Sequence, residues 1–305
     1  MAIRIERIAW NGWQNCWRIA NNDVELIVTG DIGPRILVYR FAGGRNIFKN
    51  FPDQMGSSGE SVFVNRGGSR IWIAPEDRAA TYAPDNFPVD VQQEGDTLIA
   101  TAPVEPATLL EKQMLIRLAP TGTEVEITHR VANRGLLPVE FSIWILAVLD
   151  AGGAGITGFP PRGTHPECLA PANPLVMWAF TNLADPRWRF LERYLVLHQD
   201  PAHPTPQKIG HFHPHTWGAY LLGSDLFVKR YQAEAEGRYP DFGCSFEMFA
   251  NGDVLELETL GPVKRVPPGQ AIEHVERWSL HPDVHVREWT DAGLDEALTG
   301  LRLGE

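Results

Sequence analysis

Two glutamates placed two residues apart carry the clearest chemical signal in the sequence. Glu256 and Glu258 lie in an alternating segment, so in a β-strand they share one face while Leu255 and Leu257 occupy the other. Two neighbouring carboxylates in a cleft can separate their pKa values, which leaves one of them as a better base near neutral pH. A solvated polar face of an ordinary strand is the alternative interpretation.

Arginines beside a Gly-Gly turn form a second candidate group. Arg66 and Arg70 lie on either side of Gly67-Gly68, and such a turn lets the backbone approach a ligand closely. A guanidinium group can grip vicinal hydroxyls or a carboxylate with two donors. We therefore expect Arg70 and Arg66 to contact a ligand, with Glu76 beside them. An ion pair of Arg70 with Glu76 or Asp77 is the alternative.

The ten tryptophans and one internal lysine extend the list of candidate ligand contacts. Indole faces stack on the C–H faces of sugars, and Trp72 and Trp217 are the best placed for this. Lys229, in the β-rich segment 227–231, could supply a further cation.

A histidine cluster, His211-Phe-His-Pro-His215, could present three imidazoles on one face of an extended chain. Pro214 argues against a regular inner strand there, and neither a cysteine nor a clear carboxylate ligand lies beside it. We therefore expect no metal, and we place His213 as a sugar contact or a replacement acid. The sequence contains no nucleotide-binding glycine motif, and we expect no cofactor.

Composition and charge exclude several kinds of partner. The net charge of −11 opposes binding to nucleic acid or to an anionic membrane, but it leaves a small-molecule carbohydrate open. The longest apolar run, 141–149, is far too short to span a membrane, and the first residues do not resemble a signal peptide. Three widely spaced cysteines favour reduced thiols and a cytoplasmic location.

Short apolar runs separated by Gly, Pro, Asn and Asp predict an all-β protein, a large antiparallel β-sandwich with few short helices. No composition boundary divides the chain, so we expect a single domain over residues 1–305. The segment 152–174 is rich in Gly and Pro and predicts a long loop. Asp291 is expected to cap a short C-terminal helix. Strands are predicted at 24–29, 36–41, 97–101, 113–118, 124–129, 140–149, 193–198, 217–222, 226–231, 245–249, 254–260 and 273–280.

Several motifs resemble those of aldose 1-epimerases, in the galactose mutarotase-like superfamily. Gly67-Gly-Ser-Arg-Ile-Trp-Ile-Ala-Pro-Glu76, Tyr239-Pro-Asp-Phe-Gly243 and Glu256-Leu-Glu-Thr-Leu-Gly-Pro262 look like a bacterial branch of that superfamily. Further similar motifs are Asp31-Ile-Gly-Pro-Arg-Ile36, Asn133 with Pro138-Val139, and Pro268-Gly269.

The resemblance implies a β-sandwich and a carbohydrate substrate, with Glu258 at the position of the epimerases' catalytic base. Two departures matter: Trp144 is nearest to the position of their acid histidine, and Arg66 replaces their second sugar-binding histidine. We expect a carbohydrate-binding protein. Glu256 and Glu258 favour an aldose mutarotase or epimerase acting on a monosaccharide, sugar acid or sugar phosphate, whereas the missing histidine favours binding without catalysis. A non-catalytic sugar-binding or sensing domain is the alternative.

Overall fold

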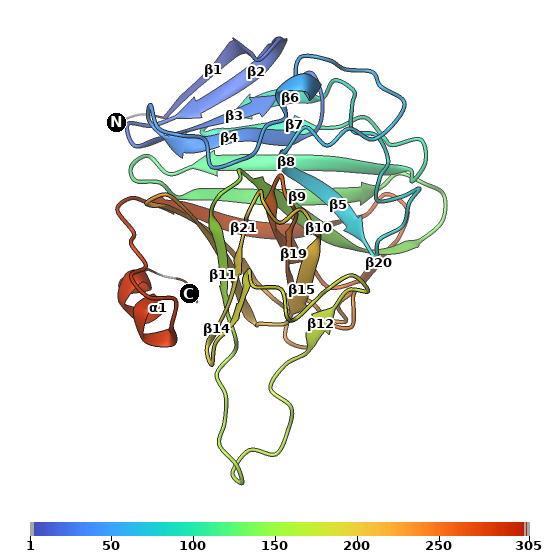
Figure 1. Cartoon of the computed structure of the whole chain (residues 1–305). Helices are drawn as coiled ribbons and strands as arrows, with labels where there is room; N and C mark the ends of the chain where they lie inside the picture. Colours follow the sequence, from blue (N-terminus) through green and yellow to red (C-terminus); the bar gives the residue numbers. More distant parts are fainter. Residues whose placement is uncertain (1–2, 302, 304–305) are drawn as a thin grey trace.

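A computed structural model describes residues 3–301 and 303, which form two large antiparallel β-sheets facing each other (Figure 1). The first sheet contains, in spatial order, β1 (Arg4–Trp10), β2 (Trp13–Ala20), β3 (Val24–Thr29), β4 (Arg35–Phe41), β5 (Gly68–Ala74), β10 (Val139–Leu149), β19 (Leu255–Leu260), β18 (Phe246–Ala250), β15 (Gln207–His211) and β12 (Leu175–Met177), with β20 (Lys264–Val266) paired to β10. The second contains β13 (Trp188–Phe190), β14 (Tyr194–His198), β11 (Ala154–Gly158), β16 (His215–Leu222), β17 (Asp225–Gln232), β21 (Ala271–His281), β9 (Val125–Asn133), β8 (Leu110–Leu118), β7 (Thr97–Thr101) and β6 (Asp90–Glu94). The predicted all-β sandwich is confirmed.

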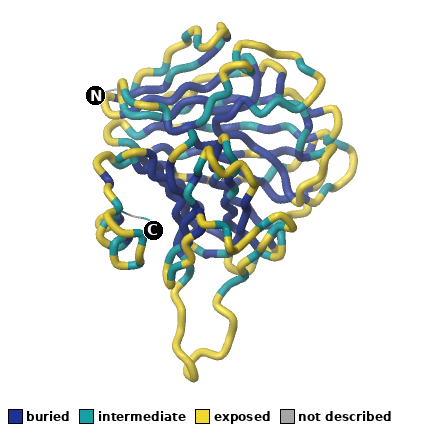
Figure 2. Tube along the Cα trace, viewed as in Figure 1, coloured by how far each residue is buried: buried dark blue, intermediate teal, exposed yellow. Residues whose placement is uncertain are grey.

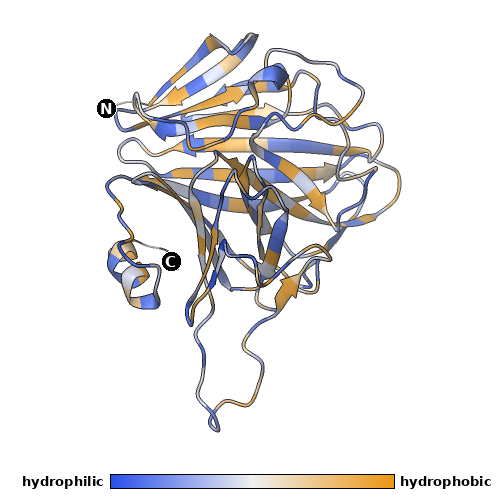
Figure 3. Ribbon diagram, viewed as in Figure 1, coloured by the Kyte–Doolittle hydropathy of each residue, from blue (hydrophilic) through white to orange (hydrophobic). Residues whose placement is uncertain are grey.

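Apolar side chains from both sheets fill the space between them. In the outer strands alternate residues are buried, as in β8, where Met114 and Ile116 are inside and the residues between them are partly exposed. Strand β10 is buried along nearly its whole length because it lies in the middle of the first sheet, between β5 and β19. The central strands in Figure 2 are accordingly dark, whereas the edge strand β1 and most connections are light. Apolar and polar residues alternate along many strands in Figure 3.

The segment 152–174, predicted as one loop, needs a correction. Its first part is β11, whose five residues are all buried between β14 and β16. Its small residues hide the strand signal. Gly155 lies against Met248 and Leu255 of the opposite sheet, and Gly158 lies against Trp217 of the neighbouring β16, so neither position has room for a side chain. The remainder, 159–174, does project from the body of the molecule as an exposed loop (Figures 1 and 2).

Helices are short in this chain. The 3₁₀ turn η1 covers Pro52–Gln54, and α1 covers Asp291–Leu298, close to the expected position. The N-cap is Thr290 rather than the predicted Asp291, since the Thr290 side chain accepts the Gly293 N–H. Asp291 instead accepts backbone N–H groups from the loop before β14. No helix in the described part of the chain is long and apolar enough to cross a membrane.

A buried ion pair of the second sheet also reaches the first sheet through hydrogen bonds. Lys229 of β17 and Glu276 of β21 are fully buried, and their Nζ and Oε1 atoms are 2.9 Å apart. Lys229 Nζ also donates to the carbonyl oxygens of Ile145 and Leu257, which lie on β10 and β19 of the opposite sheet. Burial alone would raise the pKa of Glu276, but Lys229 outweighs it and holds that pKa well below its usual range.

We predict that Lys229→Met lowers the free energy of unfolding by about 3–5 kcal/mol, because it leaves Glu276 buried and unpaired. Denaturant unfolding measures this loss. The matched control is Arg117→Met, which breaks an exposed pair with Glu126 and should cost no more than about 1 kcal/mol. The double variant Lys229→Met/Glu276→Gln should recover part of the loss, and a single variant as stable as the wild type would contradict the prediction.

Candidate functional site

A cleft of about 350 Å³ lies on the outer face of the first sheet, over β5, β10, β15 and β19. Side chains alternate across β19, so Leu255 and Leu257 enter the core while Glu256 and Glu258 face the cleft. Its walls come from the segments on either side of β5, from 178–180 and from the turn between β18 and β19. The lining residues are Phe63, Asn65, Arg70, Trp72, Glu76, Tyr82, Trp144, Leu146, Trp178, Phe180, Lys208, Phe249, Asn251, Val254, Glu256 and Glu258.

Strand pairing places the charged residues in a row across the sheet. Arg70 of β5 is opposite Leu146 of β10, and Leu146 is opposite Glu258 of β19. Glu258 is in turn opposite Glu247 of β18. Because neighbouring strands are only about 4.8 Å apart, residues from distant parts of the sequence become adjacent in this row.

Glu258 is held by two donors on one of its oxygens. Its Oε2 accepts the Trp144 indole N–H at 2.7 Å and the Lys208 ammonium at 2.8 Å. The side chain is 1% exposed, and Oε1 makes no hydrogen bond within the described part of the chain. The two donors fix the orientation of the carboxylate and leave one buried oxygen free to accept a proton.

Lys208 lies at the centre of this arrangement. Its Nζ is 2.7 Å from Glu247 Oε2 as well as bonded to Glu258, and it sits over the rings of Trp144 and Trp178 at 4.6 and 4.7 Å. Burial alone would lower the pKa of Lys208, but the two carboxylates outweigh it and raise that pKa above its usual range. Lys208 is therefore a fixed positive charge beside Glu258.

The other two carboxylates have raised pKa values. Burial and the neighbouring Glu258 raise the pKa of Glu256 to about 7, with Arg70 opposing. Glu247 is fully buried beneath Lys208, and burial raises its pKa well above the usual range. The pair on β19 therefore differs in environment: donors hold Glu258, whereas the closest cation to Glu256 is Arg70, 4.0 Å away.

Arg70 is buried between aromatic rings with part of its donor capacity unused. Its guanidinium lies over Trp72 at 4.5 Å and Phe63 at 5.0 Å, and Nη1 donates to the side chain and backbone oxygens of Asn65. Nε makes no hydrogen bond within the described residues. Burial and the neighbouring Arg35 lower the pKa of Arg70 to about 10, so it remains charged at neutral pH.

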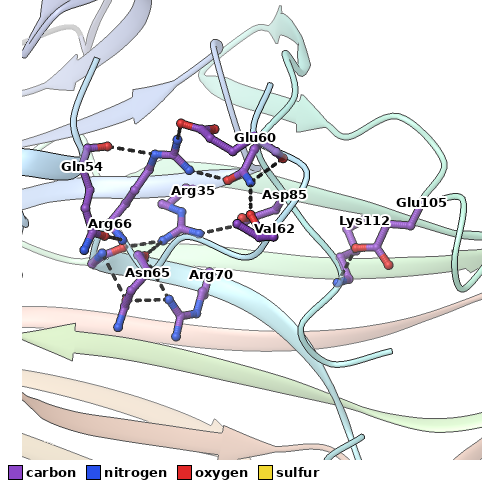
Figure 4. A network of polar contacts seen from close by, with 12 residues as sticks. Arg35, Gln54, Glu60, Val62, Asn65, Arg66, Arg70, Asp85, Glu105 and Lys112 are labelled. Carbon is purple, nitrogen blue, oxygen red and sulfur yellow. Dashed lines mark hydrogen bonds and ion pairs between the residues drawn. The ribbon is translucent and has the colours of Figure 1, made fainter. Parts of the chain in front are cut away.

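The Gly-Gly turn explains how Arg70 is supported (Figure 4). Gly67 has a φ of +84°, and a Cβ there would lie 2.0 Å from the Lys49 carbonyl oxygen, so only glycine fits. The turn directs the Asn65 carbonyl toward both Arg70 and Arg35, which donate to it. Arg35 also forms an ion pair with Asp85 at 2.5 Å, and this pair fixes the position of Arg35 behind the turn.

Arg66, Lys229, His213 and Trp217 do not line this cleft. Arg66 is fully buried behind the turn, where Gln54, Asn86 and Glu60 satisfy it (Figure 4). Lys229 lies between the sheets, as described above.

The histidine cluster and Trp217 belong to other parts of the molecule. His213 is buried and its Nδ1 accepts the His215 N–H, and burial lowers its pKa to about 4. Trp217 packs against Ala154 and Ile156 in a separate apolar cluster. Among the described residues, no three His, Cys, Asp or Glu side chains are grouped so that they could hold a metal ion.

The structure brings together Glu256, Glu258, Arg70, Trp72 and Glu76, and it adds residues that the sequence did not indicate. Lys208 and Trp178 are the main additions. Lys208 lies in β15, and the prolines at 201, 204 and 206 just before this strand conceal it. The alternation of polar Lys208 with apolar Ile209 is the local signal that could have indicated a strand there.

Solved structures with the same fold are found at low sequence identity. A galactose mutarotase-like protein from Lactobacillus casei is 9% identical, with a TM-score of 0.59 over 88% of this chain and 100% of that one. A galactose mutarotase related enzyme from Lactobacillus acidophilus is 10% identical, with a TM-score of 0.55 over 90% and 98%. A TPR-domain containing protein from Parabacteroides distasonis is 15% identical, with a TM-score of 0.57 over 88% of this chain and 47% of that one.

No protein-family model matches the chain, and no curated protein matches it. The solved structures span nearly the whole chain, and two of them are described as related to galactose mutarotase. The chain therefore has the galactose mutarotase-like fold, as its motifs indicated.

We predict that Glu256 makes stability depend on pH. The folded protein holds the Glu256 proton more tightly than the unfolded chain, so this stabilisation is complete below about pH 4.3 and is lost as the pH rises through about 7. Between pH 5 and 8, the free energy of unfolding of the wild type should fall by about 2 kcal/mol more than that of Glu256→Gln. Urea unfolding at both pH values measures the difference. Equal changes in the two proteins would refute this prediction, and the exposed Glu273→Gln should behave like the wild type.

Proposed function

We propose that the cleft binds a monosaccharide and interconverts its anomers, as aldose 1-epimerases do. The observation that carries the proposal is the buried free oxygen of Glu258, whose partner oxygen is fixed by Trp144 and Lys208. Anomer interconversion begins when a base removes the proton of the anomeric hydroxyl. Glu258 takes this role, at the position that resembles the epimerase base.

The walls of the cleft suit a sugar ring. Trp72, Trp144 and Trp178 supply aromatic surface of the kind that stacks on the C–H faces of sugars. Arg70 lines the cleft, and a guanidinium group suits a sugar hydroxyl. Two cations line the described cleft, Arg70 and Lys208, against three carboxylates. This balance favours an uncharged monosaccharide, while a sugar acid or sugar phosphate would have to compete with those carboxylates for Arg70.

A non-catalytic sugar-binding protein is the second candidate, and one observation favours it. Trp144 is nearest to the expected position of the acid histidine, and its indole N–H is already donated to Glu258. A cleft that holds a sugar but lacks a proton donor would bind without turnover.

The proposal also includes a cellular location and a kind of partner. Cys16, Cys168 and Cys244 are all free, which is usual in a reducing compartment, and we propose a cytoplasmic location. The net charge of −11 favours a small-molecule partner over nucleic acid or an anionic membrane.

We predict that Glu258→Gln retains sugar binding and lowers the rate of anomer exchange by about 10²–10⁴-fold, because the proton acceptor is lost while the shape is kept. Saturation-transfer NMR against a panel of aldoses, uronic acids and sugar phosphates identifies the ligand, and exchange NMR between its anomers measures turnover. Glu273→Gln, an exposed residue outside the cleft, serves as the control. Equal rates in the wild type and Glu258→Gln would remove Glu258 as the base. Binding without any acceleration by the wild type would favour the binding protein.

We predict that Arg70→Lys raises the Kd for that sugar by about 10–100-fold, because the ammonium group keeps the charge but loses the forked donors. Calorimetry measures the affinity. Arg66→Lys is the matched control, since Arg66 is buried in the same loop but satisfied by residues outside the cleft. It should lower Tm and change Kd less than about threefold. If both variants weaken binding equally, Arg70 acts through the loop and not through the sugar.

A further inference from the structure

Ring opening needs a proton donor as well as a base, because the ring oxygen must leave C1 as a hydroxyl. The indole at Trp144 cannot fill this role, since an indole N–H is a hydrogen-bond donor but does not release its proton near neutral pH. The acid must therefore come from another residue of the cleft, if the proposed function holds.

The other polar residues of the cleft are poorly suited to give up a proton. Tyr82 donates to Glu76, and burial followed by that carboxylate raises its pKa to about 12. Lys208 is held between Glu247 and Glu258, which strengthen its hold on its protons. Arg70, with a pKa of about 10, keeps its proton at neutral pH and is tied to Asn65.

Glu256 differs from all of these. It lies two residues before Glu258 on β19, so the two side chains project from the same face about 6–7 Å apart along the strand. That spacing lets the carboxyl groups reach the anomeric hydroxyl and the ring oxygen of one sugar from neighbouring positions. Glu256 is also the less constrained of the two, with Arg70 4.0 Å away and its side chain 12% exposed to the cleft.

We propose that Glu256 is the acid of the site and delivers its proton to the ring oxygen of the sugar. The proposal rests on the proposed function and gives the cleft a donor in place of a histidine.

The surroundings of Glu256 keep it protonated up to neutral pH. Burial and the charge of Glu258 raise its pKa to about 7, and the cations oppose this only in part. The charged and titratable groups that face it are Arg70 from β5, Glu76 and Tyr82 from the loop after β5, Lys208 from β15 and Glu258 from its own strand. The strand therefore presents Glu256 as a proton donor beside Glu258, whose Oε1 makes no hydrogen bond within the described residues.

The proton transfers balance in both directions. Glu258 Oε1 takes the proton of the anomeric hydroxyl, the C1–O bond to the ring oxygen breaks, and the ring oxygen takes the bonding pair and the Glu256 proton. C1 becomes an aldehyde, and rotation about the bond between C1 and C2 presents its other face. The hydroxyl then attacks C1 and returns its proton to Glu256, while Glu258 returns its proton to the anomeric oxygen.

Two measurements on Glu256→Gln test this assignment. With the sugar identified by NMR, exchange NMR from pH 5 to 9 should show a wild-type rate that falls above about pH 7. The variant should be at least about 100-fold slower and should lose this fall. Calorimetry with 1-deoxynojirimycin and 1-deoxygalactonojirimycin, in which nitrogen replaces the ring oxygen, should show tighter binding than to 1,5-anhydro-D-glucitol and 1,5-anhydro-D-galactitol. This preference should disappear in Glu256→Gln, while Glu273→Gln should keep both properties.

The outcomes separate the two proposals. If Glu256→Gln keeps the wild-type rate and pH profile while Glu258→Gln is inactive, the acid assignment is wrong and the mutarotase proposal stands. If Glu256→Gln is slow but its pH profile and iminosugar preference match the wild type, Glu256 has a structural role and the assignment is also wrong. If the wild type binds a sugar and accelerates nothing, both the catalytic function and its acid are refuted.

Discussion

Strand β19 packs one face into the core and lines the cleft with the other, and the rest of the site depends on this arrangement. On the inner face, Lys229 donates to the Leu257 carbonyl oxygen and the Thr259 hydroxyl donates to Glu276. These polar contacts lie among the apolar residues of the core. A slip of one residue would expose the leucines and bury the glutamates, so the core sets the register that places both carboxylates in the cleft. The buried ion pair contacts the backbone of the strand that carries Glu256 and Glu258, although the pair itself lies outside the cleft.

Buried charges must be compensated, and this need explains which residues lie together in the cleft. Carboxylates removed from water need a cation or a proton, and the site supplies both. Lys208 is paired with both Glu258 and Glu247, and burial raises the pKa values of Glu247 and Glu256. The aromatic rings around Arg70 and Lys208 exclude water and offer their faces to the cations. The result is a compact set of charges that neighbouring side chains hold in place.

Local patterns in the sequence predicted much of the sandwich but only part of the site. Alternation identified β3 and β7 at their observed bounds and placed Glu256 and Glu258 on one face. The resemblance to epimerases selected Glu258, because nothing local distinguishes it from Glu256. Periodicity could not show that Lys208 lies beside residue 258, since that proximity arises from pairing through β18.

Arg66 and Arg70, which are close together in the sequence, also show what local sequence patterns cannot predict. The two residues flank one turn and carry the same side chain, yet one is enclosed by Gln54, Asn86 and Glu60 and the other lines the cleft. The partners that decide between them come from separate loops. Their separate positions therefore depend on tertiary packing, which no local pattern contains.

The exposed loop 159–174 is a place where a protease could cut the chain into two fragments. It leaves the body between β11 and β12, and its residues are exposed or half-exposed, so a protease could cut it while uncovering little apolar surface. The strands before the cut would supply Arg70 and Trp144, and those after it Lys208, Glu256 and Glu258. Both sheets contain strands from each side of that point. The two fragments would thus each hold part of the cleft, and neither would contain all the strands of either sheet.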